Sequence, residues 1–558
     1  MSTLRVKTKI FALAITIAIV SAIGSSLFWG SHPTKDDKAI TAFISPDCSF
    51  EVISQALDCA SSEIYVAMYA LTSLRLIDKM AKAAAAGTDV KVLLEWDVVG
   101  ESRLEKEKKL SLFHHLWDLG GEVRFLEETD YSLFHAKFAI LDSETVLITS
   151  DNWVECGVPQ DRSYGNRGWG ISIKDAPFAE EMRGRFFEEW EKGTTDWIDY
   201  IKETSQGFPL ISIEGGHISN FSPMCYDLES PPEFFLSPFP YENSLIDEIS
   251  QADQSIHVEQ QTLKLNWGEE ESPYIRALKE AAERGCEVRI LLDGSPYNAL
   301  ENQKTLNHLN GWAGEYDLET RLFDQGPLRM LHNKGMVIDR RKVVISSMNW
   351  NTACQMNRDI TLVLEGEIAD YFEDVFLNDW DLEWDYHMEL DMSHRNRGIY
   401  SFERIRRELW LNSIHCKISP TWDVQSQIFL ISDPRIGITD GEREILRKFM
   451  DRGGTLIMTS FSEDDSGYEM LNICLEELGS SMVFADDAFC GYVPTSLAGE
   501  KITMLCPRAI DPGDGEILCE WDHSVLGAHE GNIYLFGSSF FVDPQNFHGT
   551  QKFFSSLL

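Results

Sequence analysis

An internal repeat constrains the fold more than any other feature of this sequence. The matched segments are Ile44–Pro46 with Leu236–Pro238, Ser62–Val66 with Ser255–Val258, and Val90–Leu94 with Val288–Leu292. In each copy, a helical stretch that ends in Gly87 or Gly285 precedes the last of these strands, and glycine suits a helix C-terminus. Strands that alternate with helices indicate an α/β fold with a largely buried sheet. We therefore predict two α/β domains related by a pseudo-twofold axis, at 38–200 and 231–384, joined by a linker at 201–230.

Both halves contain the same five polar residues at the same spacing. Counted from a histidine, lysine follows at +2, aspartate at +7, serine at +15 and asparagine at +17. The first set is His135, Lys137, Asp142, Ser150 and Asn152, and the second set is His332, Lys334, Asp339, Ser347 and Asn349. A lone His-x-Lys pair carries almost no information. Five matched positions that occur twice, each in an apolar strand context, predict a single shared site.

The spacing indicates how these side chains lie. Residues i and i+2 of a strand share a face, so His135 and Lys137 are expected to point the same way. An antiparallel return strand then brings Ser150 and Asn152 back alongside them. Two halves that meet face to face would supply two imidazoles, two ammonium groups, two amides and two hydroxyls to one pocket.

Such a pocket suits phosphodiester transfer. A neutral histidine can attack phosphorus, and a protonated one can deliver a proton to the departing alkoxide. The lysines and asparagines can hold the phosphoryl oxygens, and the serines are candidate substrate contacts. No metal ion or other cofactor is required. Asp142 and Asp339 are expected to cap turns and pair with local basic groups, and Trp153 and Trp350 to line the pocket or the core.

The two H-x-K-x-x-x-x-D motifs with S-x-N downstream resemble the phospholipase D superfamily, from Ala42 to Trp384. The resemblance implies a two-step reaction through a phosphohistidine, with water or an alcohol as second acceptor. Members of the superfamily include phospholipases, cardiolipin and phosphatidylserine synthases, and nucleases. One departure is mild: Thr149 and Ser346 precede the S-x-N serines, where the family commonly has glycine.

A second departure concerns the acid that follows an Asn-Arg pair in the family and orients the histidine of the opposite half. The second half has this acid as Asp359, which is expected to pair with His135 and fix its tautomer. The first half has Gly168 at that position, and Asp161 lies nearby but out of register. His135 is therefore the predicted nucleophile and His332 the general acid, in agreement with family habit. The loss at Gly168 predicts a less effective His332.

The N-terminus predicts the location of the protein. Arg5, Lys7 and Lys9 precede an uncharged, mostly apolar run from Ile10 to Trp29. Such a run can span a bilayer once, with the basic residues inside, or serve as a cleavable signal peptide. We predict an anchor or signal at 1–35 and an extracytoplasmic or secreted body.

The amino-acid composition limits the classes of binding partner. Ninety acidic residues against 49 basic ones give a net charge of −41, which repels polyanions at long range. A phosphate site that is locally basic remains compatible with this charge. Eleven cysteines without a C-x-x-C pair give no zinc-site signature.

A different pattern begins after Trp384. Residues 385–420 read as a charged connector, and 421–558 as a third α/β domain with strands at Ile428–Ser432, Thr455–Thr459 and Ile533–Gly537. This region resembles non-catalytic flavodoxin-like modules related to glutamine amidotransferases. It contains no nucleophile elbow, so a binding or scaffolding role is expected.

Three functions fit the sequence. The first is hydrolysis or transphosphatidylation of phospholipids at the outer membrane surface. The second is an extracytoplasmic, metal-independent nuclease that uses the same residues. The third is a degenerate phosphate-binding protein without turnover. An apolar rim at the pocket mouth would favour lipid, and a long basic groove would favour nucleic acid.

Overall fold

The computed structural model describes residues 38–127, 129–160, 164–196, 221–238, 241–396, 398–460 and 467–558. The predicted anchor or signal at 1–35 and most of the predicted linker lie outside these residues. Within the ranges given, no helix is both long enough and apolar enough to cross a bilayer.

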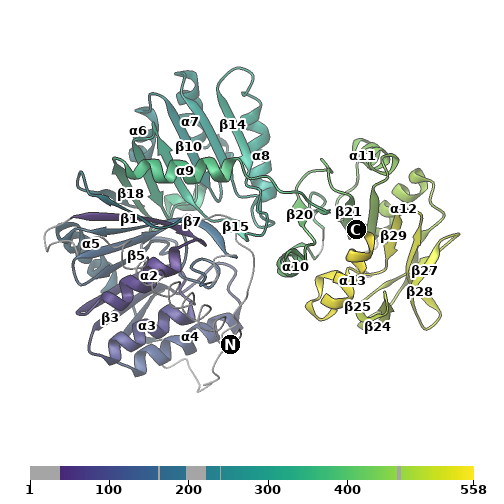
Figure 1. Ribbon diagram of the computed structural model, residues 1–558, viewed down its shortest axis with the longest axis horizontal. Coiled ribbons are helices and arrows are strands. Elements are labelled where there is room, and N and C mark those ends of the chain that lie inside the picture. Colours follow the sequence, from purple (N-terminus) through teal and green to yellow (C-terminus); the bar gives the residue numbers. More distant parts are fainter. Residues whose placement is uncertain are drawn as a thin grey trace, which may run out of the picture.

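The first half is a mixed sheet flanked by helices (Figure 1). Its strand order is β4-β3-β2-β5-β6-β7-β1-β8. The strands are β1 (Ala39–Ser45), β2 (Glu63–Met68), β3 (Asp89–Glu95), β4 (Glu122–Leu126), β5 (Lys137–Leu141), β6 (Thr145–Thr149), β7 (Asn166–Lys174) and β8 (Met224–Asp227). The helices are α2 (Ser49–Cys59), α3 (Leu74–Ala85), α4 (Arg103–Asp118) and α5 (Ala176–Trp190). Because β8 pairs with β1, part of the segment predicted as a linker is an edge strand of this sheet.

The second half repeats the arrangement with the order β14-β13-β10-β16-β17-β18-β9. Its strands are β9 (Glu233–Leu236), β10 (Ser255–Gln260), β13 (Glu287–Leu292), β14 (Leu318–Leu322), β16 (Lys334–Ile338), β17 (Lys342–Ser346) and β18 (Ile360–Glu365). Its helices are α6 (Tyr241–Ser250), α7 (Pro273–Glu283), α8 (Ala299–Asn310) and α9 (Ile368–Trp380), with the small hairpin β11 (Asn266–Trp267) and β12 (Glu270–Glu271) and the 3-10 turn η2 (Thr352–Gln355). Apart from the edge strand β8, this order matches that of the first half strand by strand, so the duplicated α/β fold predicted from the repeat is confirmed.

The local sequence explains these elements. The central parallel strands are buried on both faces, which requires continuous apolar runs such as Val90–Leu94. Gly87 and Gly285 follow α3 and α7 with φ near +100°, a backbone conformation that residues other than glycine rarely adopt. Helices α5 and α9 contribute to one apolar cluster that contains residues of both halves, including Phe186 and Phe372. The two halves thus share a core.

A third sheet follows, with the order β20-β19-β21-β22-β29-β28-β27. Its strands are β19 (Met388–Asp391), β20 (Cys416–Ser419), β21 (Ile428–Ser432), β22 (Thr455–Thr459), β27 (Glu516–Trp521), β28 (Ser524–Glu530) and β29 (Ile533–Phe536). Around it lie α10 (Ile399–Leu411), α11 (Asp440–Asp451), α12 (Gly467–Leu478) and α13 (Phe547–Leu557), and the hairpin-like pairs of β23 (Val483–Ala488) with β26 (Arg508–Asp511) and of β24 (Tyr492–Leu497) with β25 (Glu500–Leu505). The third domain begins at Met388, inside the segment predicted as a connector, because β19 and β20 both pair in this sheet.

Candidate active site

The two histidines lie where the halves join. The backbone N–H of His135 donates to the carbonyl oxygen of Arg358 at 2.8 Å, and that of His332 donates to Arg167 at the same distance. The short strand β15 (Met330–Leu331), just before His332, pairs in parallel with the start of β7. Each histidine is therefore held by the backbone of the opposite half, as the predicted pseudo-twofold arrangement requires.

His135 is enclosed by three groups. Its Nδ1 lies 2.7 Å from Oδ1 of Asp359, across the interface, and its Nε2 lies 3.2 Å from Nζ of Lys137. The ring of Tyr69 packs edge-on against the imidazole, with ring centres 4.8 Å apart. Ser347, predicted to contact substrate, donates to the same Asp359 oxygen at 2.7 Å. The hydroxyl of Ser347 thus orients the carboxylate that orients His135.

His332 also has a carboxylate partner, which corrects an expectation from the sequence. Its Nδ1 lies 3.1 Å from Oδ1 of Asp151 and 3.0 Å from Nζ of Lys334. The glycine at position 168 predicts a less effective His332 because it removes one acid, but the structure supplies an acid from Asp151 instead. Asp161 lies outside the described residues and is not needed to explain the pairing.

In the first half, the acid that pairs with a histidine stands at position 151 instead of position 168. A Cβ added at Gly168 would lie 3.0 Å from Oδ2 of Asp151, so the two positions face the same small space. In the second half the acid stands at Asp359, and the residue equivalent to Asp151 is Met348. The signal was present in the sequence: the S-x-N element reads Ser-Asp-Asn in the one half that lacks the later acid.

The predicted asparagines and the remaining serine have different surroundings. Ser150 accepts a hydrogen bond from the backbone N–H of Trp169 at 2.9 Å. The amide oxygens of Asn152 and Asn349 are buried and have no hydrogen-bond partner within the described part of the chain. Asn152 and Asn349 directly follow Asp151 and its counterpart Met348 in the sequence.

The motif aspartates stand away from the chemistry. Asp142 accepts hydrogen bonds from the backbone N–H groups of residues 61–63, and Asp339 accepts them from residues 253–255. Backbone amides, rather than the expected basic side chains, are the hydrogen-bonding partners. The carboxylates fix the turns that end β5 and β16 to the neighbouring strands. Trp153 and Trp350 are fully buried in the two domain cores.

A further pair of carboxylates near the histidines was not predicted from the sequence. Glu95 accepts the backbone N–H of Phe134 at 2.6 Å, and Asp293 accepts that of Leu331 at 3.0 Å. Phe134 and Leu331 are the residues directly before the two histidines. Glu95 and Asp293 each follow the matched apolar run of β3 or β13, so the repeat itself aligns them. Both are buried, and burial raises the pKa of each carboxyl, that of Asp293 to about 6.

Burial and neighbouring cations govern the electrostatics. Burial and the Lys137 ammonium lower the pKa of His135 to about 4, and burial and Lys334 do the same for His332. Burial lowers the pKa of Lys137 to about 7, and burial together with Lys137 lowers that of Lys334 well below its usual value. Burial alone would raise the pKa of Asp359, but His135 and Lys137 hold it below its ordinary range. A bound phosphate would favour the protonated forms of these imidazoles and ammonium groups.

These shifts predict the pH dependence. Catalysis by two histidines needs one neutral and one protonated imidazole, and kcat/KM reports the free enzyme. Since both imidazoles lose their protons above about 4, kcat/KM for an alkyl phosphodiester should rise as the pH falls from 8 to 5. It should fall again below about 4, when the nucleophile is also protonated. The profile of kcat should lie at higher pH, because a bound phosphate favours imidazolium. A maximum of kcat/KM above pH 8 would contradict this electrostatic description.

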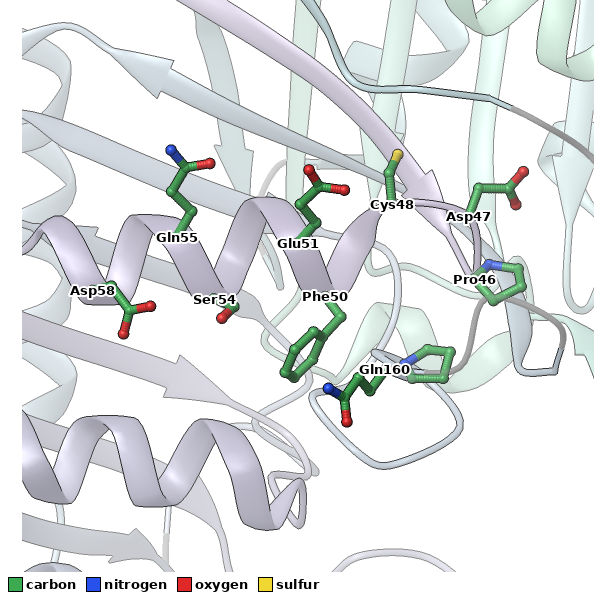
Figure 2. A pocket seen from close by; sticks show the side chains of 10 residues that line it. Pro46, Asp47, Cys48, Phe50, Glu51, Ser54, Gln55, Asp58 and Gln160 are labelled. Carbon is green, nitrogen blue, oxygen red and sulfur yellow. The ribbon is translucent and has the colours of Figure 1, made fainter. Parts of the chain in front are cut away.

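A separate hollow lies on the outer side of the first half (Figure 2). It has a volume of about 350 Å³ and is lined by residues along α2 from Phe50 to Asp58, by Pro46–Cys48 before this helix, and by Pro159 and Gln160. Asp47, at its edge, pairs with the Arg167 guanidinium at 2.8 Å, and neither histidine lines it. Within the described ranges, no group of three or more His, Cys, Asp or Glu side chains is arranged to hold a metal ion.

Comparison with known proteins agrees with this geometry. A family model described as "Cardiolipin synthase, PLD-like domain" matches residues 53–190 and 245–380. A phospholipase D of Rickettsia bellii (strain RML369-C) is 30% identical over 182 residues, which cover 32% of this chain and 84% of the relative. The chain belongs to the phospholipase D superfamily. Each of its two matched segments carries one H-x-K motif of this superfamily.

Two further similarities are more distant. A phospholipase D of Rickettsia conorii (strain ATCC VR-613 / Malish 7) is 29% identical over 136 residues, 24% of this chain and 61% of that relative. The crystal structure of phosphatidylserine synthase from Haemophilus influenzae Rd KW20 covers 61% of this chain and 85% of its own, with 17% identity and a TM-score of 0.43.

Proposed function

We propose that this member of the phospholipase D superfamily cleaves or exchanges phospholipid phosphodiesters through a phosphohistidine. The observation that carries the proposal is the pairing of each buried imidazole with a carboxylate of the opposite half, Asp359 on His135 and Asp151 on His332. A carboxylate on Nδ1 leaves Nε2 for chemistry, as in hydrolase triads. Two such dyads in one site can serve as nucleophile and general acid.

The proposed steps balance in atoms and protons. The Nε2 lone pair of His135 attacks phosphorus, the bond from phosphorus to the alcohol oxygen breaks, and His332 gives its proton to that oxygen. Water or an alcohol then attacks the phosphohistidine, its proton passes to His332, and the bond from phosphorus to His135 breaks. Lys137 and Lys334, with the amides of Asn152 and Asn349, would stabilise charge on the phosphoryl oxygens. The shorter carboxylate contact, 2.7 Å at His135 against 3.1 Å at His332, supports His135 as nucleophile.

Exposed apolar side chains close in structure or sequence to residues that contact the two histidines favour a lipid substrate. Val99, Tyr297 and Met356 are 77%, 45% and 53% exposed. The N–H of Val99 donates to the hydroxyl of Tyr69, whose ring packs on His135. Met356 lies two residues before Arg358, whose carbonyl binds His135, and Tyr297 packs against Arg329, three residues before His332. We call Val99, Tyr297 and Met356 the apolar rim. Exposed apolar groups beside a site commonly mark a binding surface.

The nuclease alternative uses the same chemistry but is less favoured. Nucleic-acid binding gains most of its affinity from neutralised phosphates, and a chain with a net charge of −41 opposes this over its surface. The degenerate alternative rested on the missing acid beside His332. Asp151 fills that role, which removes the main reason to expect an inactive site.

A substrate panel tests the proposal. The purified chain is incubated with vesicles of phosphatidylcholine or phosphatidylglycerol, with single-stranded DNA, and with a soluble short-chain phosphodiester, each with excess EDTA. We expect headgroup release from vesicles that survives EDTA, because imidazoles supply both nucleophile and acid. Cleavage of DNA alone would favour the nuclease, turnover of none would favour a binding protein, and strict dependence on added zinc or magnesium would refute the mechanism.

A matched pair of variants tests the apolar rim. Met356→Asp should lower activity on vesicles by about tenfold, because burying an apolar side chain of this size is worth about 1.5–3 kcal/mol, and leave the soluble diester within twofold. Ile517→Asp in the third domain is the control, since Ile517 is 52% exposed but lies on β27, in the third domain. Equal losses for both variants would argue against the apolar rim as a lipid contact.

The proposal extends to location and to the third domain. The N-terminal apolar run would place the site at the extracytoplasmic membrane face, either anchored or secreted. Parallel strands β20, β19, β21, β22 and β29 support a flavodoxin-like relationship for the third domain, without a catalytic centre of its own.

A further inference from the structure

A side chain of the third domain binds the backbone of the loop at residues 324–329, which leads to His332. Arg406 on α10 is 2% exposed, and its guanidinium donates to the backbone carbonyl oxygens of Gly326 and Leu328. Glu403, one turn earlier, pairs with the same guanidinium at 2.8 Å. Figure 1 shows α10 on the side of the third domain that faces β15. A planar group with several fixed donors can hold two carbonyls and a carboxylate at once.

Side chains of the segment between α9 and the third domain bind the same loop. The Tyr386 hydroxyl accepts the N–H of Gly326 at 3.2 Å and donates to Asp324. Gly326 has a φ of +50°, and a Cβ there would lie 2.3 Å from the indole of Trp384, so only glycine fits beneath that ring. The loop is thus fixed by Arg406 of the third domain and by Trp384 and Tyr386, which lie just before that domain.

The loop determines where His332 lies. Directly after Leu328, the N–H of Arg329 donates to the carbonyl of Gly165 at 3.0 Å, and Met330–Leu331 then pairs with β7. Arg407, next to Arg406, lies over the ring of Tyr164, just before β7, at 4.1 Å. Consecutive residues of α10 therefore hold both strands whose pairing positions His332.

The loop before His135 is held differently. The N–H of Ser132 donates to the carbonyl of Met356 at 2.6 Å, and the Tyr131 hydroxyl donates to Glu189 at 2.9 Å. Both partners belong to the two catalytic halves. The pseudo-twofold symmetry of the site is thus broken by the third domain, which supports the His332 side.

We infer that Arg406 is a positioning residue for His332, and that the third domain is part of the catalytic unit. The inference rests on the proposed function, in which His332 protonates the leaving group. Loss of the guanidinium would leave two carbonyls and the Glu403 carboxylate buried without their donor, which the loop can relieve only by moving. A shift of about 1 Å far from the chemistry can cost about 100-fold in rate.

Arg406→Ala in the full chain, assayed on two soluble substrates, tests the inference. An alkyl phosphodiester needs a protonated leaving group, whereas a nitrophenyl phosphodiester does not. We expect kcat on the alkyl substrate to fall 10- to 100-fold with KM within twofold, and kcat on the nitrophenyl substrate to fall less than threefold. Tyr386→Phe, which removes one hydroxyl and keeps the ring, should show the same selective loss on a smaller scale.

Control variants separate this result from a general loss of stability. Arg443 pairs with Asp440 and Glu477 within the third domain, so Arg443→Ala should leave both rates within twofold. Equal losses of Arg406→Ala on both substrates, a loss confined to KM, or unchanged rates in both Arg406→Ala and Tyr386→Phe would overturn the inference. A wild-type chain inactive on both substrates would instead reject the proposed function.

Discussion

Replacing His135 with asparagine should abolish the covalent phosphoenzyme and lower kcat by at least about 10⁴-fold on every substrate, because the proposed nucleophile is lost. His332→Asn should behave differently. It should lower turnover of alkyl phosphodiesters by about 10²–10⁴-fold, the usual worth of general acid catalysis, and spare nitrophenyl phosphodiesters. Rapid acid quench with labelled substrate, followed by mapping of the labelled histidine, measures both effects.

A variant of the acid that pairs with His135 provides a comparison for this experiment. Asp359→Asn should resemble a milder His135 defect, because an amide cannot stabilise the charge that develops on the imidazole. Label trapped on His332 and absent from His135 in the wild-type chain would reverse the two roles. Both histidines have a carboxylate partner, so the roles are assigned only from the difference in contact distance, 2.7 Å at His135 and 3.1 Å at His332. The labelling experiment tests that assignment directly.

The repeat and the paired motifs were readable from the sequence because they depend on local spacing. A histidine and a lysine two residues apart share one face of a strand wherever the strand lies. The order of strands in both halves follows from the same alternation of apolar segments and glycine-terminated helices. The two histidines and two lysines therefore lie together in the structure, whereas Asp142 and Asp339 lie away from them.

The start of the third domain was missed for a physical reason. Met388–Asp391 alternates apolar and acidic residues, which reads as an exposed segment, yet all four residues are buried. Asp391 is accommodated because the indole N–H of Trp422 donates to it at 2.8 Å and His394 lies 2.9 Å away. Trp422 lies about 30 residues further on. Such partners are set by tertiary structure, and periodicity cannot reveal them.

The acid for His332 was missed because it was sought at one position in each half. Function requires a carboxylate at a point in space, and two backbone positions reach that point. Asp151 and Gly168 lie next to each other, and Met348 and Asp359 occupy the matching sequence positions in the second half. We therefore expect an acid at position 151 or at position 168 to pair with His332, provided that the residue at the other position is uncharged.

This equivalence predicts a rescue. Asp151→Asn should lower kcat by up to about 10⁴-fold on alkyl phosphodiesters, since the carboxylate that fixes the imidazole tautomer and stabilises its charge is lost. Gly168→Asp alone should also be harmful, because its Cβ would lie 3.0 Å from Oδ2 of Asp151 and would place two carboxylates together. The double variant Asp151→Met with Gly168→Asp copies the second half and should recover at least about 10-fold of the activity lost in Asp151→Met.

The double variant is informative because the two single changes are each damaging. A purely structural role for Asp151 predicts that their costs add, whereas exchange of one carboxylate predicts strong non-additivity. The kcat/KM profile of the double variant should again rise from pH 8 to 5, because His332 regains an anionic partner of the same kind. Additive losses, with no recovery in the double variant, would show that the carboxylate at Asp151 does more than orient His332.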